Sequence, residues 1–155
     1  MGTPEVEVFL DDIADKPPVI DEGKLVLVEV ADANVKFGRE SGDPYINLEN
    51  RVTEDPEDEG APLYDILPLP LEKREGESAK AYKKRMDRRC YRLKQAALAF
   101  GVKLAGGRKP VEVAEAFIGR RAWCKTKLDT DQRDQQQSRP DGYYPENEKP
   151  EEEKA

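Results

Sequence analysis

The chain has 155 residues, of which 38% are charged and 37% hydrophobic, and its formal net charge is −7. This composition predicts one domain with a small core and flexible ends. The sequence contains no histidine, so the usual zinc ligand and the usual general base are missing; we expect neither a metal nor another cofactor, and no enzymatic activity.

Residues 1–22 form an acidic segment in which Glu5–Leu10 alternates well enough to pair as an edge strand. Gly23 then precedes a run rich in β-branched residues, 24–31, which predicts a central strand. We place the start of the folded core at residue 23 and its end at residue 130.

The next strand, over residues 45–52, alternates clearly. Ile46, Leu48 and Val52 point toward the core, which leaves Tyr45, Asn47 and Arg51 exposed. After an acidic loop, residues 62–67 predict a third strand, which Pro68 and Pro70 end. The pattern does not settle which face Tyr64 takes. The three strands together are typical of an antiparallel meander.

A long basic helix is predicted next, with Ser78 as its N-cap and Gly101 just past its C-terminus. Residues 72–94 hold ten Lys and Arg against four Asp and Glu. This excess favours contact with a polyanion over a merely solvated face. Its candidate contacts are Arg88, Arg89 and Arg92.

The only tryptophan, Trp123, lies in a predicted strand over residues 121–128. Alternation places it on one face with three cations, which are Arg121, Lys125 and Lys127. An aromatic ring flanked by cations suits single-stranded nucleic acid, because bases stack on the ring while the cations follow the phosphates. The alternative is a tryptophan that closes the end of a barrel, with lysines that keep a strand edge soluble.

Residues 131–155 are polar and end in an acidic stretch that includes Glu151, Glu152 and Glu153. Such a composition is typical of a flexible, disordered tail. The tail is either a solubility device or a segment that occupies a basic groove and recruits protein partners. Cys90 and Cys124 follow no metal-like or redox-like spacing, which indicates reduced thiols and a cytoplasmic protein.

Four stretches resemble a family of small phage and prophage single-stranded-DNA-binding proteins. They are residues 41–48 (SGDPYINL), 61–65 (APLYD), 91–101 (YRLKQAALAFG) and 117–123 (FIGRRAW). The likeness spans about residues 19–147. It implies an OB-fold, a five-stranded Greek-key barrel that binds single strands on its open face, with an acidic C-terminus used in protein contacts.

In that family a closing strand follows the segment matching residues 141–148, but here the chain continues as Lys149-Pro150 and three glutamates. Three sources for the fifth strand stay open: residues 142–148, the N-terminal residues 6–10, or a second subunit.

The sequence thus predicts a non-enzymatic, sequence-tolerant single-stranded-DNA-binding protein of phage replication or recombination. Trp123, Tyr45 and, more weakly, Tyr64 would stack bases, while Arg51, Arg121, Lys125 and Lys127 would contact phosphates. The acidic tail would bind replication or recombination proteins. Whether the protein forms a homodimer is left open by the sequence. The alternative is a protein-interaction adaptor without nucleic-acid contact.

Overall fold

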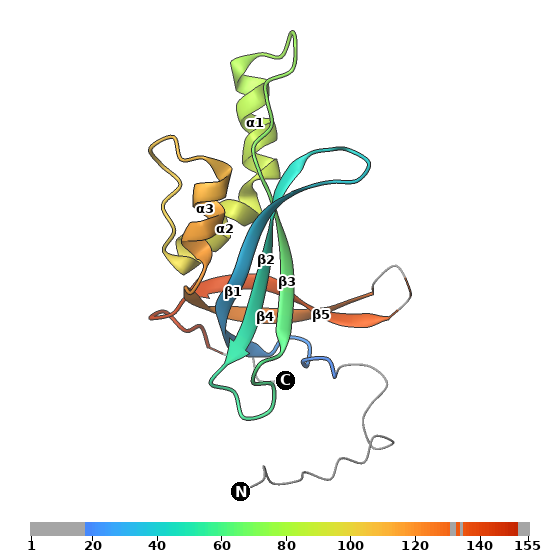
Figure 1. The fold of residues 1–155 in the computed structure, drawn as a ribbon, viewed down its shortest axis with the longest axis vertical. Coiled ribbons are helices and arrows are strands. Elements are labelled where there is room, and N and C mark those ends of the chain that lie inside the picture. The colour runs from blue at the N-terminus through green and yellow to red at the C-terminus, as the bar shows by residue number, and fades with distance from the viewer. Residues whose placement is uncertain (1–17, 131–132, 134, 152–155) are drawn as a thin grey trace, which may run out of the picture.

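The computed structural model describes residues 18–130, 133 and 135–151. In this part the chain is mainly β, with five antiparallel strands in one open sheet of order β3-β2-β1-β4-β5 and three helices between β3 and β4 (Figure 1). The strands are β1 (Leu25–Phe37), β2 (Pro44–Thr53), β3 (Pro62–Pro68), β4 (Arg121–Thr130) and β5 (Gln136–Pro145), and the helices are α1 (Ala79–Arg89), α2 (Tyr91–Phe100) and α3 (Pro110–Phe117).

The core lies between one face of the curved sheet and the helices α2 and α3. The alternation predicted for β2 is confirmed, since Ile46, Leu48 and Val52 are all buried. On the helical side, the ring of Phe100 packs edge-on against Phe117, with centroids 5.8 Å apart, and lies 5.1 Å from the ring of Tyr143 in β5. This aromatic cluster fixes α2 and α3 on the sheet.

The predicted single helix is two helices, α1 and α2, separated at Cys90, whose backbone leaves helical geometry at φ −96° and ψ 12°. Both predicted ends are confirmed: the hydroxyl of Ser78 accepts from the N–H of Ala81, and Gly101 adopts φ 73°. The two helices differ in what they bury. No residue of α1 is buried, whereas α2 buries most of its apolar residues, so α2 supplies the apolar helix surface that packs in the core.

The folded unit is longer at both ends than the predicted range of 23–130. Residues 136–145 form β5 and pair with β4, although we assigned them to the flexible tail. Upstream, Ile20 is 1% exposed and belongs to the core, and its N–H donates to the hydroxyl of Ser138 at 2.6 Å. The fifth strand therefore comes from the C-terminal side of this chain. The alternative source, residues 6–10, lies outside the described residues.

A buried polar network links β3 to β5, the two outer strands of the sheet order. Asp65 is 6% exposed and accepts hydrogen bonds from the hydroxyl of Tyr143 at 2.9 Å and from Arg92 at 2.7 Å. The amide of Asn50 donates to the Tyr143 hydroxyl at 3.0 Å, while its own Oδ1 is buried with no partner among the described residues. This network brings β3 and β5 together and curves the sheet.

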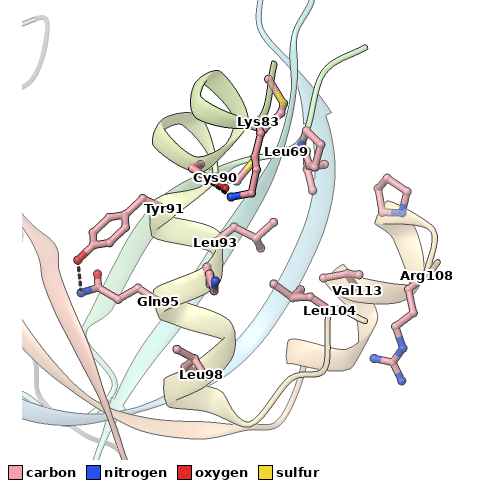
Figure 2. Close-up of a pocket in the computed structure, with 15 residues that line it drawn as sticks. Leu69, Lys83, Cys90, Tyr91, Leu93, Gln95, Leu98, Leu104, Arg108 and Val113 are labelled. Atoms are coloured by element: carbon pink, nitrogen blue, oxygen red, sulfur yellow. Dashed lines mark hydrogen bonds and ion pairs between the residues drawn. The ribbon is translucent and has the colours of Figure 1, made fainter. Parts of the chain in front are cut away.

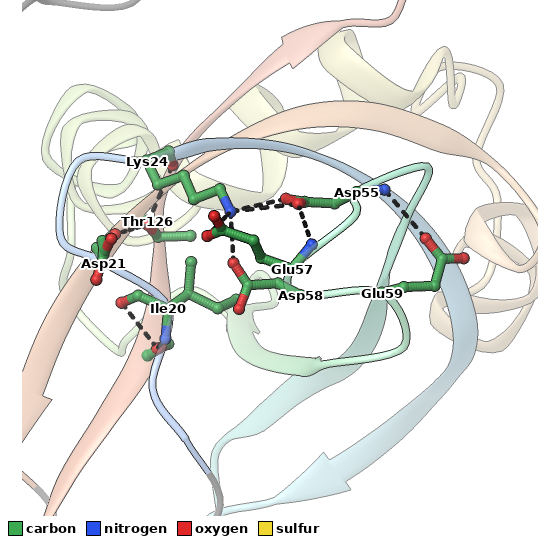
Figure 3. Close-up of polar contacts among 9 residues, drawn as sticks. Ile20, Asp21, Lys24, Asp55, Glu57, Asp58, Glu59 and Thr126 are labelled. Carbon is green, nitrogen blue, oxygen red and sulfur yellow. Dashed lines mark hydrogen bonds and ion pairs between the residues drawn. The ribbon is translucent and has the colours of Figure 1, made fainter.

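The acidic loop between β2 and β3 is held by Lys24, as Figure 3 shows. The ammonium of Lys24 lies 2.8 Å from Asp55, 2.6 Å from Asp58 and 3.6 Å from Glu57. The backbone at Lys24 is itself fixed, because Thr126 in β4 donates to its carbonyl through both N–H and Oγ1. The carboxylates of this loop therefore surround a lysine that ties the loop to the start of β1.

Replacing Lys24 by methionine should destabilise the fold at pH 7 by about 1–3 kcal/mol, since it leaves two largely buried carboxylates without a cation. Hydrogen bonds to Asp55 and Asp58 raise the pKa of Lys24, and the bond from Lys24 lowers the pKa of Asp55. The contribution is therefore present from about pH 4 to pH 10 and is lost as the pH falls through the lowered pKa of Asp55. Urea unfolding at pH 7 and about pH 2.5 measures it, with Lys36→Met at an exposed position as the control.

Both cysteines are free thiols. Cys124 is fully buried in β4, and burial raises its pKa strongly; burial also raises the pKa of the less enclosed Cys90. Among the described residues no helix has the length and apolar character needed to cross a bilayer.

Candidate nucleic-acid interface

The strand that carries Trp123 alternates as predicted. Ala122, Cys124 and Thr126 are buried on the core side of β4. Trp123, Lys125 and the other members of the opposite set are half-buried on the outer face. Trp123 is therefore neither a core residue nor a fully open one.

The segment that follows β5 partly covers Trp123. The indole N–H donates to the carbonyl of Glu146 at 3.0 Å, and the ammonium of Lys149 lies 4.4 Å from the centroid of the ring. Leu27, the cross-strand neighbour of Trp123 in β1, is only 5% exposed. One ring face is thus occupied by a cation of the same chain, and a base that stacks there has to displace Lys149.

Tyr144 lies beside Trp123, because the two residues are partners in the β4–β5 register. Further along the same pair of strands Lys127 is opposite Arg139, and Lys125 lies between the aromatic pair and this cationic pair. We call these five residues, Trp123, Lys125, Lys127, Arg139 and Tyr144, the β4–β5 patch. Among the described residues neither Lys125 nor Lys127 has an ion-pair partner, whereas Arg139 lies 3.6 Å from Asp129.

Two of the predicted phosphate contacts are instead paired with carboxylates. Arg121 lies 3.4 Å from Glu29, 3.5 Å from Glu54 and 3.8 Å from Glu146. Arg51 pairs with Glu49 at 2.7 Å. In the register Arg51 and Arg121 flank Glu29 from opposite sides. The two arginines at the centre of the outer face are therefore matched by four carboxylates and leave no excess of positive charge in this band.

Tyr45 and Tyr64 lie on the outer face beyond this band. Their alternation in β2 and β3 is clear, and the face of Tyr64 is now settled, since its side chain is 49% exposed. Tyr45 pairs with Lys36 near the end of β1, whereas Trp123 pairs with Leu27 near its start. Nine residues of strand separate the two positions, which is roughly 30 Å at about 3.3 Å per residue. The structure does not bring the two predicted stacking residues together.

The predicted secondary basic surface on the helices divides into structural and exposed cations. Arg92 is held by Asp65, and Arg89 donates to the carbonyls of Leu69 at 2.6 Å and Pro44 at 3.0 Å. Both side chains therefore fasten helices to the sheet. Arg88 is exposed on α1. Nearby, Arg85 holds the pKa of Glu77 at about 2 by a side-chain hydrogen bond.

Sequence reasoning missed Tyr144 and Arg139, because both lie in residues that we assigned to the tail. Of the predicted tail contacts, Glu151 is exposed, and Glu152 and Glu153 lie outside the described residues. A signal was available in the sequence, which is the pair of aromatic residues in Gly142-Tyr143-Tyr144-Pro145. In the structure one of them is buried and the next is on the opposite face.

No family model and no curated protein matches the chain.

Proposed function

We propose that this protein binds single-stranded DNA without sequence preference and without catalysing a reaction, through the β4–β5 patch. The proposal extends to the fold, which we take to be an OB-fold. Its support is the strand order β3-β2-β1-β4-β5, the helices between β3 and β4, and the network of Asp65 and Tyr143 that joins the two outer strands.

The observation that carries the proposal is the cross-strand pair of Trp123 and Tyr144 next to two lysines that have no described ion-pair partner. Two aromatic side chains at paired positions of neighbouring strands offer stacking positions for bases, at about 1–3 kcal/mol per base. Lys125 and Lys127 follow at a spacing of two residues on the same face, which is the direction a phosphate backbone would take along the strand.

The wider role is proposed on the resemblance of residues 19–147 to phage and prophage single-stranded-DNA-binding proteins. That role is replication or recombination in a bacterial cytoplasm, with the acidic C-terminal residues in contact with partner proteins. The covering of Trp123 by Lys149 agrees with a tail that leaves the site when DNA enters.

Titration of the protein with oligo-dT at several salt concentrations tests the proposal. We expect Trp123 fluorescence to be quenched and the binding constant to fall with salt. In a Lys125→Gln, Lys127→Gln variant the salt slope should shrink by about 1.4, which is the loss of two contacts to a single strand. Lys80→Gln with Lys84→Gln on the exposed side of α1 is the matched control. Unchanged emission together with salt-independent binding would contradict the proposal.

A second candidate is a protein-interaction adaptor. The observation that favours it is the pairing of Arg51 and Arg121 with carboxylates, which leaves fewer cations for phosphates than the sequence suggests. A gel-shift comparison of single- and double-stranded DNA separates the two, because an adaptor shifts neither.

A further inference from the structure

An apolar groove of about 870 Å³ lies between α1, α2 and the segment that leads into α3 (Figure 2). One of its walls is a stripe of α2 at helical spacing, formed by Tyr91, Lys94, Gln95 and Leu98. Leu69, Leu93 and Val113 add apolar surface. We call this hollow the helical groove; it lies apart from the β4–β5 patch and its inference is independent of the proposed function.

The groove exposes apolar side chains that the described fold does not use. Leu98 is 71% exposed and Tyr91 is 61% exposed, while α2 docks on the sheet through its other side, with Leu93 and Phe100 buried. A gathering of exposed large apolar residues in a hollow marks a binding surface. A groove of this form takes an amphipathic segment with apolar side chains at positions i, i+3, i+4 and i+7.

The charged residues that line the helical groove indicate which kind of amphipathic segment fits it. Three cations line the helical groove, Lys83, Lys94 and Arg108, against one carboxylate, Asp87. Asp87 is already paired with Lys83 at 2.8 Å. The occupant that fits is therefore an acidic segment, whose carboxylates meet Lys94 and Arg108 at the rim.

The chain itself carries such a segment before the first described residue. Val6, Phe9, Leu10 and Ile13 follow the spacing i, i+3, i+4 and i+7. The positions around them are filled with carboxylates, which are Glu5, Glu7, Asp11, Asp12 and Asp15. Residues 5–15 thus match the helical groove both in apolar spacing and in charge.

The lengths of chain involved favour a second copy as the source. Between Ile13 and Pro18 there are five residue steps, which span at most about 17 Å. Residue 18 leads into the start of β1, whereas Leu69 in the groove follows Pro68, whose partner Tyr45 pairs with Lys36 at the far end of β1. The length of β1 is roughly 40 Å at about 3.3 Å per residue, so the segment of the same copy does not reach along the groove.

We propose that residues 5–15 of one copy bind in the helical groove of a second copy. When the exchange is reciprocal, both grooves are filled and the assembly closes as a symmetric dimer.

Two full-length variants test this by complementation. Leu98→Asp removes the groove but keeps the segment, and Phe9→Asp with Leu10→Asp removes the segment but keeps the groove. Leu98 is largely exposed, so its replacement leaves the core intact. In sedimentation velocity we expect the parent protein to be dimeric and each variant alone to be monomeric. An equimolar mixture should form a heterodimer held by one segment, with affinity at least tenfold below that of the parent. Ile66→Asp, at an exposed apolar position on the outer face of β3, is the control and should dimerise as the parent does.

Three results would overturn the proposal: a monomeric parent, variants that still dimerise, or a mixture that stays monomeric. The last result, with a dimeric parent, indicates that residues 6–10 pair elsewhere, for example at a sheet edge. None of these results bears on binding to oligo-dT, so the two proposals are tested independently.

Discussion

Replacing Asp65 by alanine should destabilise the protein by about 3–5 kcal/mol, the range found when one partner of a buried ion pair is removed. Asp65 is 6% exposed, and its carboxylate receives both the Tyr143 hydroxyl and the guanidinium of Arg92. Without it, a fully buried hydroxyl and a partly buried cation lose their acceptor together. Because Asp65 is in β3 and Tyr143 in β5, the loss falls on the contact that joins the two outer strands.

Urea unfolding followed by circular dichroism measures the effect, with the exposed neighbour Ile66→Ala in the same strand as the control. Arg92→Ala should also destabilise the fold, by a smaller amount, because the Tyr143 hydroxyl still satisfies part of Asp65. The double variant should lose less than the two single losses added, since both remove the same pair. Additive losses would show that Asp65 and Arg92 act independently.

The pairing of Arg92 with Asp65 could not be predicted from the sequence. A cation in a basic run predicts phosphate contact, since charge patterning carries no information about which acid folds against it. Asp65 is 27 residues away in sequence from Arg92. Likewise, three carboxylates from three separate parts of the chain surround Arg121. Alternation placed Arg121 and Arg51 on the correct face, but their partners depend on strand register, which the pattern alone does not determine.

The sequence correctly predicted those features that depend on residues close together in the chain. The faces of β2 and β4, the cap at Ser78 and the stop at Gly101 follow from neighbouring residues, and all four are as expected. The sequence left only residues 142–148 open as one of three sources of the fifth strand and assigned the rest of β5 to the tail, because the sequence of β5, QQSRPDGYYP, is polar and contains proline and glycine. Its stability comes from pairing with β4 and from the burial of Tyr143 against Phe100, neither of which a local window contains.

Replacing Trp123 by alanine should weaken binding to oligo-dT by about 1–3 kcal/mol, the range for losing one base–aromatic stack. Fluorescence anisotropy of a labelled oligonucleotide measures this without relying on tryptophan emission. Tyr45→Ala is the informative comparison, since Tyr45 lies roughly 30 Å away along β1 by strand rise. An equal loss in both variants would indicate a strand that crosses the whole outer face, whereas a loss confined to Trp123 restricts contact to the β4–β5 patch. No loss in the Trp123 variant would exclude the patch as the stacking site.

Removing the segment after β5 provides a second test of the role of Trp123 in binding oligo-dT. Ending the chain at Pro145 removes the hydrogen bond from the indole to Glu146 and the cation of Lys149 over the ring. A cation–π contact at an exposed site is worth about 0.5–1 kcal/mol, so uncovering Trp123 should tighten binding by about two- to fivefold. Replacing Glu151, Glu152 and Glu153 by glutamine lowers the tail charge but keeps Lys149 in place. If that variant binds as tightly as the shortened chain, repulsion by the tail accounts for the effect; if only the shortened chain tightens, and no longer does so once Trp123 is alanine, Lys149 competes with a base for the ring.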